Sequence, residues 1–498
     1  MDANIIELGE SPSASTTRIL TEIKKVAPDT KDLAKALEDL KKMCVDPTFA
    51  AEFKVRKGLQ LLMHGVSNGK FRLAELAQVL QAINSLQEVF GDGEGEVGDV
   101  EVEQVFVSQL AELTSKENQQ LALATRCALN ILATFVREGK GRDMINNSVA
   151  LPNLIGLLGN SDQGIQLASL RLINSLLAAA SLERKADMVR SLQERPARSL
   201  ILDHLLKKDS EVGYQLYLLQ HHMLSLLLVR LSTAIQPQDG ANLQKIKDLR
   251  STAFDTGSPS VKNNTRYAQD HKKLGFNNVK DPSMDFMDTP PGILALDCMD
   301  YFAKRHQEKF MKVVLENSCR QDNHECPFAA SSCELVKLLA NILGVGQPPL
   351  PVGSTSRYHE MFFKVEHPFE EFFSVCVVLL NKTWREMRAT REDFTKVFDV
   401  VKEQIESSLV LDKERPKTFE EFRSNVKSYG EISRRWQSDA KSREAWKGSA
   451  PVAELRQHLA PGIEELITQQ RGNFMVEGTR FHRYKKTGEQ AKAQSQYR

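Results

Sequence analysis

Cysteine and histidine side chains that could bind a metal ion gather in one short stretch, at Cys319, His324, Cys326 and Cys333. Structural zinc sites usually pair their cysteines at C-x₂₋₄-C spacing, and these gaps are wider with no second pair. Glu325 follows His324, but no second histidine completes an H-E-x-x-H pattern. We therefore predict reduced thiols that are buried or partly exposed. No nucleophile elbow, P-loop or kinase signature occurs either, so no cofactor is expected.

Three arginines, Arg385, Arg388 and Arg391, follow Trp384 at the end of an expected helix. We interpret Trp384 as a core residue, because an indole ring buries a large apolar area. The guanidinium groups either form a solvated face or meet an acidic partner, since arginine forms forked bonds with carboxylates and phosphates. We favour the solvated face.

A minimal PxxP pattern, typical of polyproline ligands, is formed by Pro348 and Pro351. No arginine flanks this pair closely before Arg357. We therefore interpret residues 347–351 as a rigid loop.

The elements of this chain are predicted to be helices. In its first half, apolar residues recur with a helical period from Thr17 to about Arg230. The clearest unit, residues 151–180, predicts a helix, a turn at 159–162 and a second helix. A looser copy spans 105–132, with its turn near 116–118. Two copies about 45 residues apart fit the period of armadillo and HEAT repeats, which stack into a solenoid with a concave docking surface. A plain helical bundle is the alternative.

Residues 1–15 contain a short apolar run at 5–8, then a serine-rich segment that we expect to be flexible. The run cannot be stable alone. It is either a disordered tail or the last strand of another domain.

The stretch 272–302 opens with turn-forming residues and continues into a strongly apolar segment. Thr289 is the predicted N-cap and Pro290 the predicted first helical residue. One buried helical stripe is expected from the three-residue steps of Ile293, Leu296, Met299 and Phe302.

Further helix boundaries are indicated by capping-box spacing, at Ser331 with Glu334 and at Thr390 with Asp393. Gly344 is expected to end the first of these helices.

Near the end of the chain, residues 451–470 form an apolar helical stripe that Pro461 interrupts. Its members include Leu455, Leu459, Ile463, Leu466 and Ile467.

Bulk composition agrees with a helical protein of more than one domain, since the chain has 498 residues, 41% of them hydrophobic and 26% charged. A net charge of +1 provides no basic excess for binding nucleic acid. Seven scattered cysteines favour a reducing compartment, and the N-terminus has no secretory signal pattern. The apolar run 214–231 is interrupted by polar residues, so we predict a buried helix rather than a membrane span. A cytoplasmic protein is expected.

The region from 272 to 405 resembles the ELMO (engulfment and cell motility) domain. The resemblance rests on Gly275-Phe276, Asp285-Phe286, Pro291-Gly292-Ile293-Leu294-Ala295-Leu296, Tyr301-Phe302, 324–328 and 381–384. It implies an all-α fold, with an armadillo-like helical repeat solenoid followed by an all-helical ELMO domain. The implied boundaries are 16–239 for the repeats, 240–410 for the ELMO domain and 411–470 for a helical extension.

Against the family pattern, the sequence is expected to be cut at both ends. Residues 1–15 resemble a tail or remnant of a ubiquitin-like domain, and 471–498 resemble the start of an incomplete pleckstrin-homology domain. Residues 474–479 are similar to the approach to its first strand.

The residue after Asp285-Phe286 bears on catalysis. In the branch of the superfamily that activates GTP hydrolysis by Arf-type GTPases, an arginine follows this pair, whereas here the residue is Met287. Loss of an arginine finger typically costs roughly 10³–10⁵ in rate, because its guanidinium stabilises charge on the transferred phosphoryl group. We therefore expect no catalytic residue and no enzyme. An Arf-directed GTPase-activating protein is the alternative.

The resemblance implies a non-catalytic adaptor that partners a DOCK-type guanine nucleotide exchange factor. It would promote Rac activation, actin remodelling, phagocytosis of apoptotic cells and cell motility, from the cytoplasm and with recruitment to the plasma membrane. An upstream Rho- or Arf-family GTPase or a membrane receptor is a further implied partner. The resemblance implies that the apolar stripe in 451–470 docks the exchange factor. In the family, a proline-rich tail takes part in the same docking. A scaffold with no GTPase link is a third interpretation.

Overall fold

The computed structural model describes residues 11–25, 30–91, 101–115, 121–206, 210–236, 238–255, 264–320, 323–352, 358–409 and 415–477. The chain divides into two units, residues 1–426 and 427–498, which are described separately. Helices are the only regular elements within these ranges, and no strand occurs in them. The predicted all-α fold class is confirmed.

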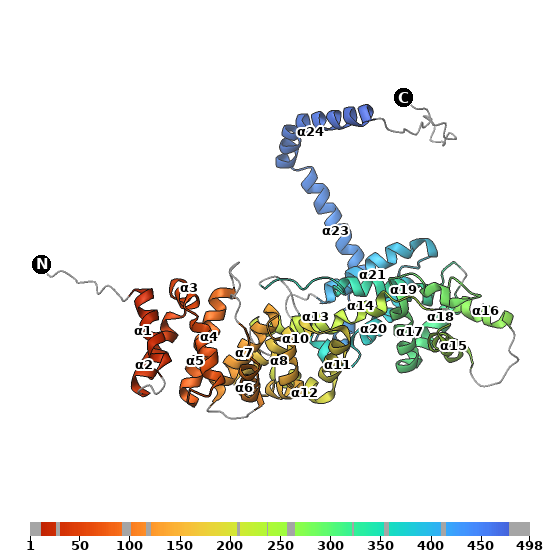
Figure 1. Ribbon diagram of the computed structural model, residues 1–498. Helices are drawn as coiled ribbons and strands as arrows, with labels where there is room; N and C mark the ends of the chain where they lie inside the picture. Colours follow the sequence, from red (N-terminus) through yellow and green to blue (C-terminus); the bar gives the residue numbers. More distant parts are fainter. Residues whose placement is uncertain are drawn as a thin grey trace. The chain divides into compact units, whose positions relative to one another are not determined.

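The first part of unit one is a stack of helices that follow one another in chain order (Figure 1). They are α1 (Pro12–Lys24), α2 (Thr30–Met43), α3 (Pro47–Val55), α4 (Gly58–Ser67), α5 (Leu73–Gly91), α6 (Gln104–Ser115), α7 (Ala122–Glu138), α8 (Arg142–Ser148), α9 (Leu151–Leu157), α10 (Gln163–Ala179), α11 (Leu182–Gln193), α12 (Arg195–His204) and α13 (Ser210–Ser225). Each packs mainly on close neighbours, as α7 does on α5, α6 and α10. This is the packing of a helical solenoid rather than of a closed bundle.

Both predicted repeats contain a pair of helices, α6 with α7 and α9 with α10. The predicted turn at 159–162 is confirmed, since the Asp162 carboxylate accepts the backbone N–H of Gly164 at 2.7 Å and caps α10. The other turn, near 116–118, lies outside the described residues. The short helix α8 was not expected, because seven residues are too few to display a readable period.

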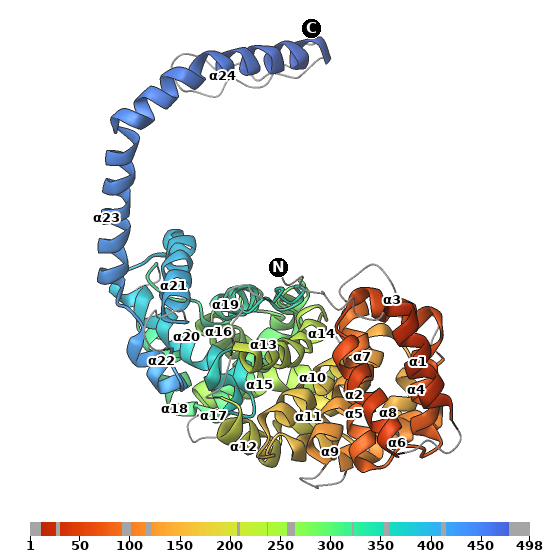
Figure 2. The ribbon, with the colours of Figure 1, turned by 90° about the vertical axis from the view of Figure 1, so that its left-hand side faces the viewer.

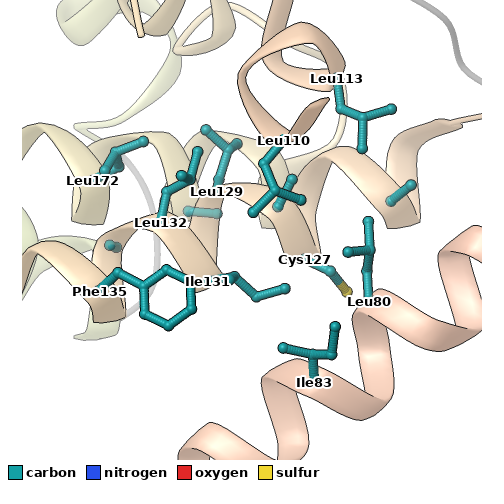
Figure 3. Close-up of a cluster of buried hydrophobic side chains, with 14 of the residues drawn as sticks. Leu80, Ile83, Leu110, Leu113, Cys127, Leu129, Ile131, Leu132, Phe135 and Leu172 are labelled. Carbon is teal, nitrogen blue, oxygen red and sulfur yellow. The ribbon is translucent and has the colours of Figure 1, made fainter. Parts of the chain in front are cut away.

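A continuous hydrophobic cluster runs through this stack. Figure 3 shows side chains from four helices meeting in it: Leu80 of α5, Leu110 of α6, Ile131 and Phe135 of α7, and Leu172 of α10. All five are fully buried. Each stabilises the fold by about 1.5–3 kcal/mol relative to exposure, so the stack depends on neighbours covering one another.

The serine-rich segment near the N-terminus is helical, and the expectation of a flexible segment there is wrong. The Ser11 hydroxyl accepts the backbone N–H of Ala14 at 3.3 Å, and α1 begins at Pro12. Serine followed by proline is a start signal for a helix, because proline has no N–H to lose in the first turn. The apolar run at 5–8 lies outside the described residues.

The second part of unit one gathers around α17, which contacts α14, α15, α18, α19 and α20. Its elements are α14 (Leu227–Leu231), α15 (Gly240–Phe254), α16 (Asn264–Lys273), the 3₁₀ helix η2 (Pro282–Phe286), α17 (Gly292–Arg305), α18 (Gln307–Ser318), α19 (Phe328–Ile342), η3 (Glu360–Phe363), α20 (Pro368–Glu386), η4 (Arg391–Asp393), α21 (Phe394–Leu409) and α22 (Phe419–Asn425). The predicted stripe of α17 is buried at Leu296, Met299 and Phe302, whereas Ile293 is only partly covered.

A second hydrophobic cluster begins at Leu224, in the last turn of α13, and includes Leu227, Leu231 and Ile235. These residues precede the sequence-based boundary at 239/240, so α14 packs with the later helices. The first cluster ends at Leu219 on the same helix α13 but also takes in Phe363 of η3. The two clusters therefore share one helix.

The loop that contains the PxxP pattern is tied to α13. The Leu350 carbonyl accepts the hydroxyl of Tyr214 at 3.2 Å, and the Leu350 N–H donates to the hydroxyl of Tyr217 at 3.0 Å. Further along, the hydroxyl of Tyr358 donates to the Leu206 carbonyl at 3.0 Å. These bonds join the second part of unit one to the end of the repeats.

The two predicted capping boxes have different outcomes. The box at Thr390 and Asp393 is present, and the Thr390 N–H donates to the Asp393 carboxylate at 3.1 Å. The box at Ser331 is wrong, because α19 already begins at Phe328 and Ser331 is buried inside it. Gly344 follows the end of that helix with φ 65°, as expected of a helix terminator.

The second unit contains α23 (Tyr429–Lys447) and α24 (Ala450–Glu477). Figure 2 shows α24 leading on from the end of α23 rather than packing along it. Pro461 lies inside α24. Residues 474–477, expected to approach a strand, instead form the last turn of α24. No helix in the described ranges is both long enough and apolar enough to cross a membrane.

Candidate functional site

The turn that carries the Asp-Phe pair is fixed by both of its side chains. The Asp285 carboxylate accepts the backbone N–H groups of Asn277 and Asn278 at 2.6 and 3.0 Å. Phe286 is fully buried, and its ring meets that of Phe276 edge to face with centroids 6.2 Å apart. The acidic residue therefore holds the loop, and the aromatic residue anchors it in the core.

Two glycines of the motif occupy positions that other residues cannot fill. Gly275 has φ 81°, and a Cβ there would lie 2.5 Å from Cα of Pro327. Gly292 has φ 53°, and a Cβ there would lie 2.5 Å from the Thr233 carbonyl oxygen. Positive φ and close backbone contact both require glycine at these points.

The predicted start of α17 at Thr289 and Pro290 is wrong, because the helix begins at Gly292. The Ile293 N–H donates to the Thr233 carbonyl at 2.8 Å. The carbonyl of a neighbouring segment thus satisfies a donor that a side-chain cap would otherwise take. Local capping rules cannot anticipate such a tertiary partner.

Met287 closes this turn as the residue directly after η2. Its side chain is 44% exposed, and the carboxylate-bearing residues Asp285 and Asp288 flank it in sequence. A thioether carries neither charge nor hydrogen-bond donors. Met287 therefore offers no group that could stabilise negative charge on a transferred phosphoryl group.

A different arginine, Arg230 of α14, is partly buried in the same region. Its guanidinium forms ion pairs with Asp297 at 3.0 Å and with Glu370 at 2.9 Å, and Lys245 reaches Asp297 at 2.6 Å. Burial alone would lower the pKa of Arg230, but the two carboxylates outweigh it and raise that pKa. Held on two sides, this arginine joins helices and is not a mobile finger.

Sequence reasoning missed this network, because its members are far apart in the chain and no local pattern links them. The only signal in the sequence is the arginine that interrupts an apolar run at 230.

The five predicted partner-binding side chains all lie on α24, on one face of that helix. Their exposed fractions are 57% for Leu455, 47% for Leu459, 50% for Ile463, 60% for Leu466 and 44% for Ile467. Half-exposed leucines and isoleucines at helical spacing form an apolar surface that could bind a partner. The structure brings these five together, while Met287 belongs to the other unit.

The cysteines considered as metal ligands are separate thiols. No group of three or more histidine, cysteine or acidic side chains in the described part of the chain is arranged to hold a metal ion. Cys326 and Cys333 are buried, and Cys319 is exposed. Burial raises the pKa of Cys326 to about 11 and that of Cys333 to about 12, which keeps both protonated at neutral pH.

Trp384 is buried, as predicted, and its indole N–H donates to the His324 carbonyl at 3.1 Å. The three arginines that follow it are exposed or at the surface; Arg385 and Arg391 lie within 3.9 and 3.4 Å of the acidic residues Glu316 and Glu325.

These features define a class of protein, in which an armadillo-like helical solenoid adjoins an all-helical domain with Met287 directly after the Asp285-Phe286 pair. Residues 225–398 match the ELMO/CED-12 family, and residues 48–206 match the armadillo-like helical domain of ELMO proteins. The chain is 37% identical over 505 residues to engulfment and cell motility protein 1 of Homo sapiens, a match that covers 97% of this chain and 68% of that protein.

Engulfment and cell motility protein 2 of Homo sapiens is 37% identical over 498 residues, with the same two shares. Protein 3 of Rattus norvegicus is 32% identical over 498 residues, covering 97% of this chain and 67% of the relative. The chain belongs to the ELMO (engulfment and cell motility) family.

Proposed function

We propose that this chain is a non-catalytic adaptor that partners a DOCK-type guanine nucleotide exchange factor and, through it, promotes Rac activation. Family membership supports a role in engulfment and cell motility, because the relatives are named engulfment and cell motility proteins. The resulting processes are actin remodelling, phagocytosis of apoptotic cells and cell migration. The observation that carries the proposal is the half-exposed apolar face of α24.

The α24 face consists of Leu455, Leu459, Ile463, Leu466 and Ile467. Full burial of such a side chain stabilises a complex by about 1.5–3 kcal/mol. Each is already about half covered, so a partner would gain roughly half of that per residue. Together, five such contributions offset part of the free energy that is lost when two proteins give up their independent motion in a complex.

The same proposal assigns recruitment to the rest of the chain. The solenoid presents a long surface on which an upstream Rho- or Arf-family GTPase or a membrane receptor would bind, and this brings the complex from the cytoplasm to the plasma membrane. Repeat stacks are suited to this role, because their surface extends with each added helix pair.

The test is capture of the purified chain by a DOCK-type exchange factor. Leu459→Asp and Leu466→Asp place charge in the α24 face and should weaken capture by about tenfold or more. Gln457→Asp is the matched control, because two positions before Leu459 a helix has turned by roughly 200°. Circular dichroism should show equal helix content in all three variants.

A Rac nucleotide-exchange assay completes the test. The wild-type chain should accelerate exchange by the DOCK-type factor, and the two leucine variants should do so less. If the leucine variants bind like wild type, or if Gln457→Asp weakens capture equally, the α24 face is not the docking surface.

A further inference from the structure

A basic cavity lies where the ends of α18 and α20 meet the segment that precedes α19. It has a volume of about 280 Å³ and is lined by Arg320, His324, Trp384, Arg385, Arg388 and Ala389. No carboxylate belongs to this described lining. We propose that this cavity binds a phosphate monoester dianion, a function that nothing in the adaptor role requires.

The guanidinium of Arg320 is the first observation. Within the described part of the chain, its Nη2 has one long bond, 3.4 Å, to the side-chain oxygen of Asn381, and its Nη1 is buried with no hydrogen-bond partner. An unsatisfied buried donor costs about 1–3 kcal/mol, and more when it is charged. Such a group in a native fold calls for a partner, and a bound anion would supply one.

The backbone at Arg388 is the second observation. Arg388 has φ 52°, a left-handed conformation that helices usually assign to glycine after their last turn. The Ala389 N–H donates to the Trp384 carbonyl at 3.1 Å, as in a standard glycine-type helix end. An arginine that accepts this strained position adds a guanidinium to the cavity wall, where a glycine would have been more stable.

The frame around the cavity is well bonded. Nδ1 of His324 lies 3.1 Å from the Ala389 carbonyl, which leaves Nε2 for another contact. The indole of Trp384 is fixed by its bond to the His324 carbonyl. Arg320, Arg385 and Arg388 line one space, and Glu316 lies 3.9 Å from the Arg385 guanidinium at its edge. Guanidinium groups on one cavity wall repel one another, so an anion bound between them is stabilised.

Size and charge select the ligand class. A volume of about 280 Å³ gives room for a phosphate group and part of the molecule that carries it. A phosphate monoester carries close to two negative charges and three acceptor oxygens at neutral pH, which fits several arginines better than a carboxylate does. Its source is either a phosphorylated side chain of another protein or a small soluble phosphate.

The experiment titrates the full chain with three probes in a calorimeter: inorganic phosphate, a phosphotyrosine pentapeptide with glycine flanks, and the same peptide without phosphate. We expect saturable one-to-one binding of at least one phosphate probe and none of the unphosphorylated peptide. Tighter binding of the phosphopeptide assigns the site to a protein side chain, and tighter binding of inorganic phosphate assigns it to a small soluble phosphate.

Arg388→Gly separates binding from folding. It should weaken binding of the phosphate probe roughly tenfold, because one guanidinium is lost. It should not lower the midpoint temperature of unfolding, because glycine readily adopts the left-handed conformation. Arg190→Ala removes an exposed arginine of α11 and should change neither quantity. Absence of saturable binding by both phosphate probes, or equal affinity in wild type and Arg388→Gly, would overturn the proposal.

Discussion

The guanidinium of Arg230 on α14 lies 2.9 Å from the carboxylate of Glu370 on α20, although 140 positions separate them in the chain. Glu370 is 7% exposed, and the same guanidinium also pairs with Asp297 of α17. One side chain thus joins the segment that leaves the repeats to two central helices of the ELMO domain.

Removing this arginine should destabilise the fold strongly. Arg230→Met leaves Glu370 buried without a counter-ion, a situation that typically costs about 3–5 kcal/mol. Because Arg230 is itself about one-third exposed, we expect the free energy of unfolding to fall by an amount near the lower end of this range, about 3 kcal/mol. Urea unfolding followed by circular dichroism measures this change. Arg190→Met, at a solvent-exposed pair, should cost less than about 0.5 kcal/mol.

The double variant Arg230→Met with Glu370→Met provides a check on the cause. Removing both charges should recover most of the lost stability, because the cost arises from the unpaired carboxylate. A double variant as unstable as Arg230→Met would show that the arginine acts through packing alone.

Acidification should weaken the junction between the two hydrophobic clusters. Burial, with a contribution from Lys185, lowers the pKa of His222 to about 3, and burial with Arg415 lowers that of His359 to about 4. The unfolded chain binds these protons near pH 6.5, so the stability that neutral histidines provide is lost as pH falls from about 6.5 towards 4. Each histidine contributes at most about 1.4 kcal/mol per pH unit.

The measurement is the free energy of unfolding between pH 7.5 and 5. Its slope against pH should be shallower in a His222→Gln and His359→Gln double variant than in wild type. Equal slopes in the two proteins would assign the acid sensitivity to other groups.

Gly292→Ala should be among the most damaging single substitutions in the domain. The new Cβ would lie 2.5–2.8 Å from the carbonyl oxygens of Thr233, Arg230 and Leu231, at a residue whose φ is 53°. The backbone has to move to relieve these close contacts, so we expect the free energy of unfolding to fall by about 3 kcal/mol or more. Thermal or urea unfolding measures it. Gly156→Ala in α9, with open space around the new Cβ, should instead be neutral or stabilise by up to about 1 kcal/mol. Similar losses in both variants would contradict this reasoning.

The purified chain should not accelerate GTP hydrolysis by an Arf-type GTPase. Met287 is uncharged, and the nearby Arg230 is held by two carboxylates, so neither supplies a mobile guanidinium. Single-turnover hydrolysis with and without the chain should agree within about twofold, against a gain of roughly 10³–10⁵ expected from an arginine finger. An ELMO-domain protein with arginine at the position of Met287 is the positive control, and clear stimulation by the present chain would defeat the adaptor proposal.

Much of the secondary structure could be predicted, because helix periodicity is a local property. The turn at 159–162, the box at Thr390 and the stop at Gly344 were confirmed, since each depends on side chains within one helical turn of the backbone groups they affect. The start of α17 could not be predicted in the same way, because the N–H of Ile293 bonds to the Thr233 carbonyl from another segment. The start of α1 at Ser11 and Pro12 follows from the same kind of local signal.

By itself, the sequence determined that the protein is helical, that Met287 follows the Asp285-Phe286 pair with an uncharged side chain, and that α24 carries five apolar residues on one face. These facts follow from residue identity and from a period of 3.6 residues. Only the tertiary structure decided that Arg230 meets Glu370, that α13 serves two cores, and that Arg320 joins Arg385 and Arg388 around one cavity. Such meetings depend on how helices pack, and packing brings together residues that no local pattern relates.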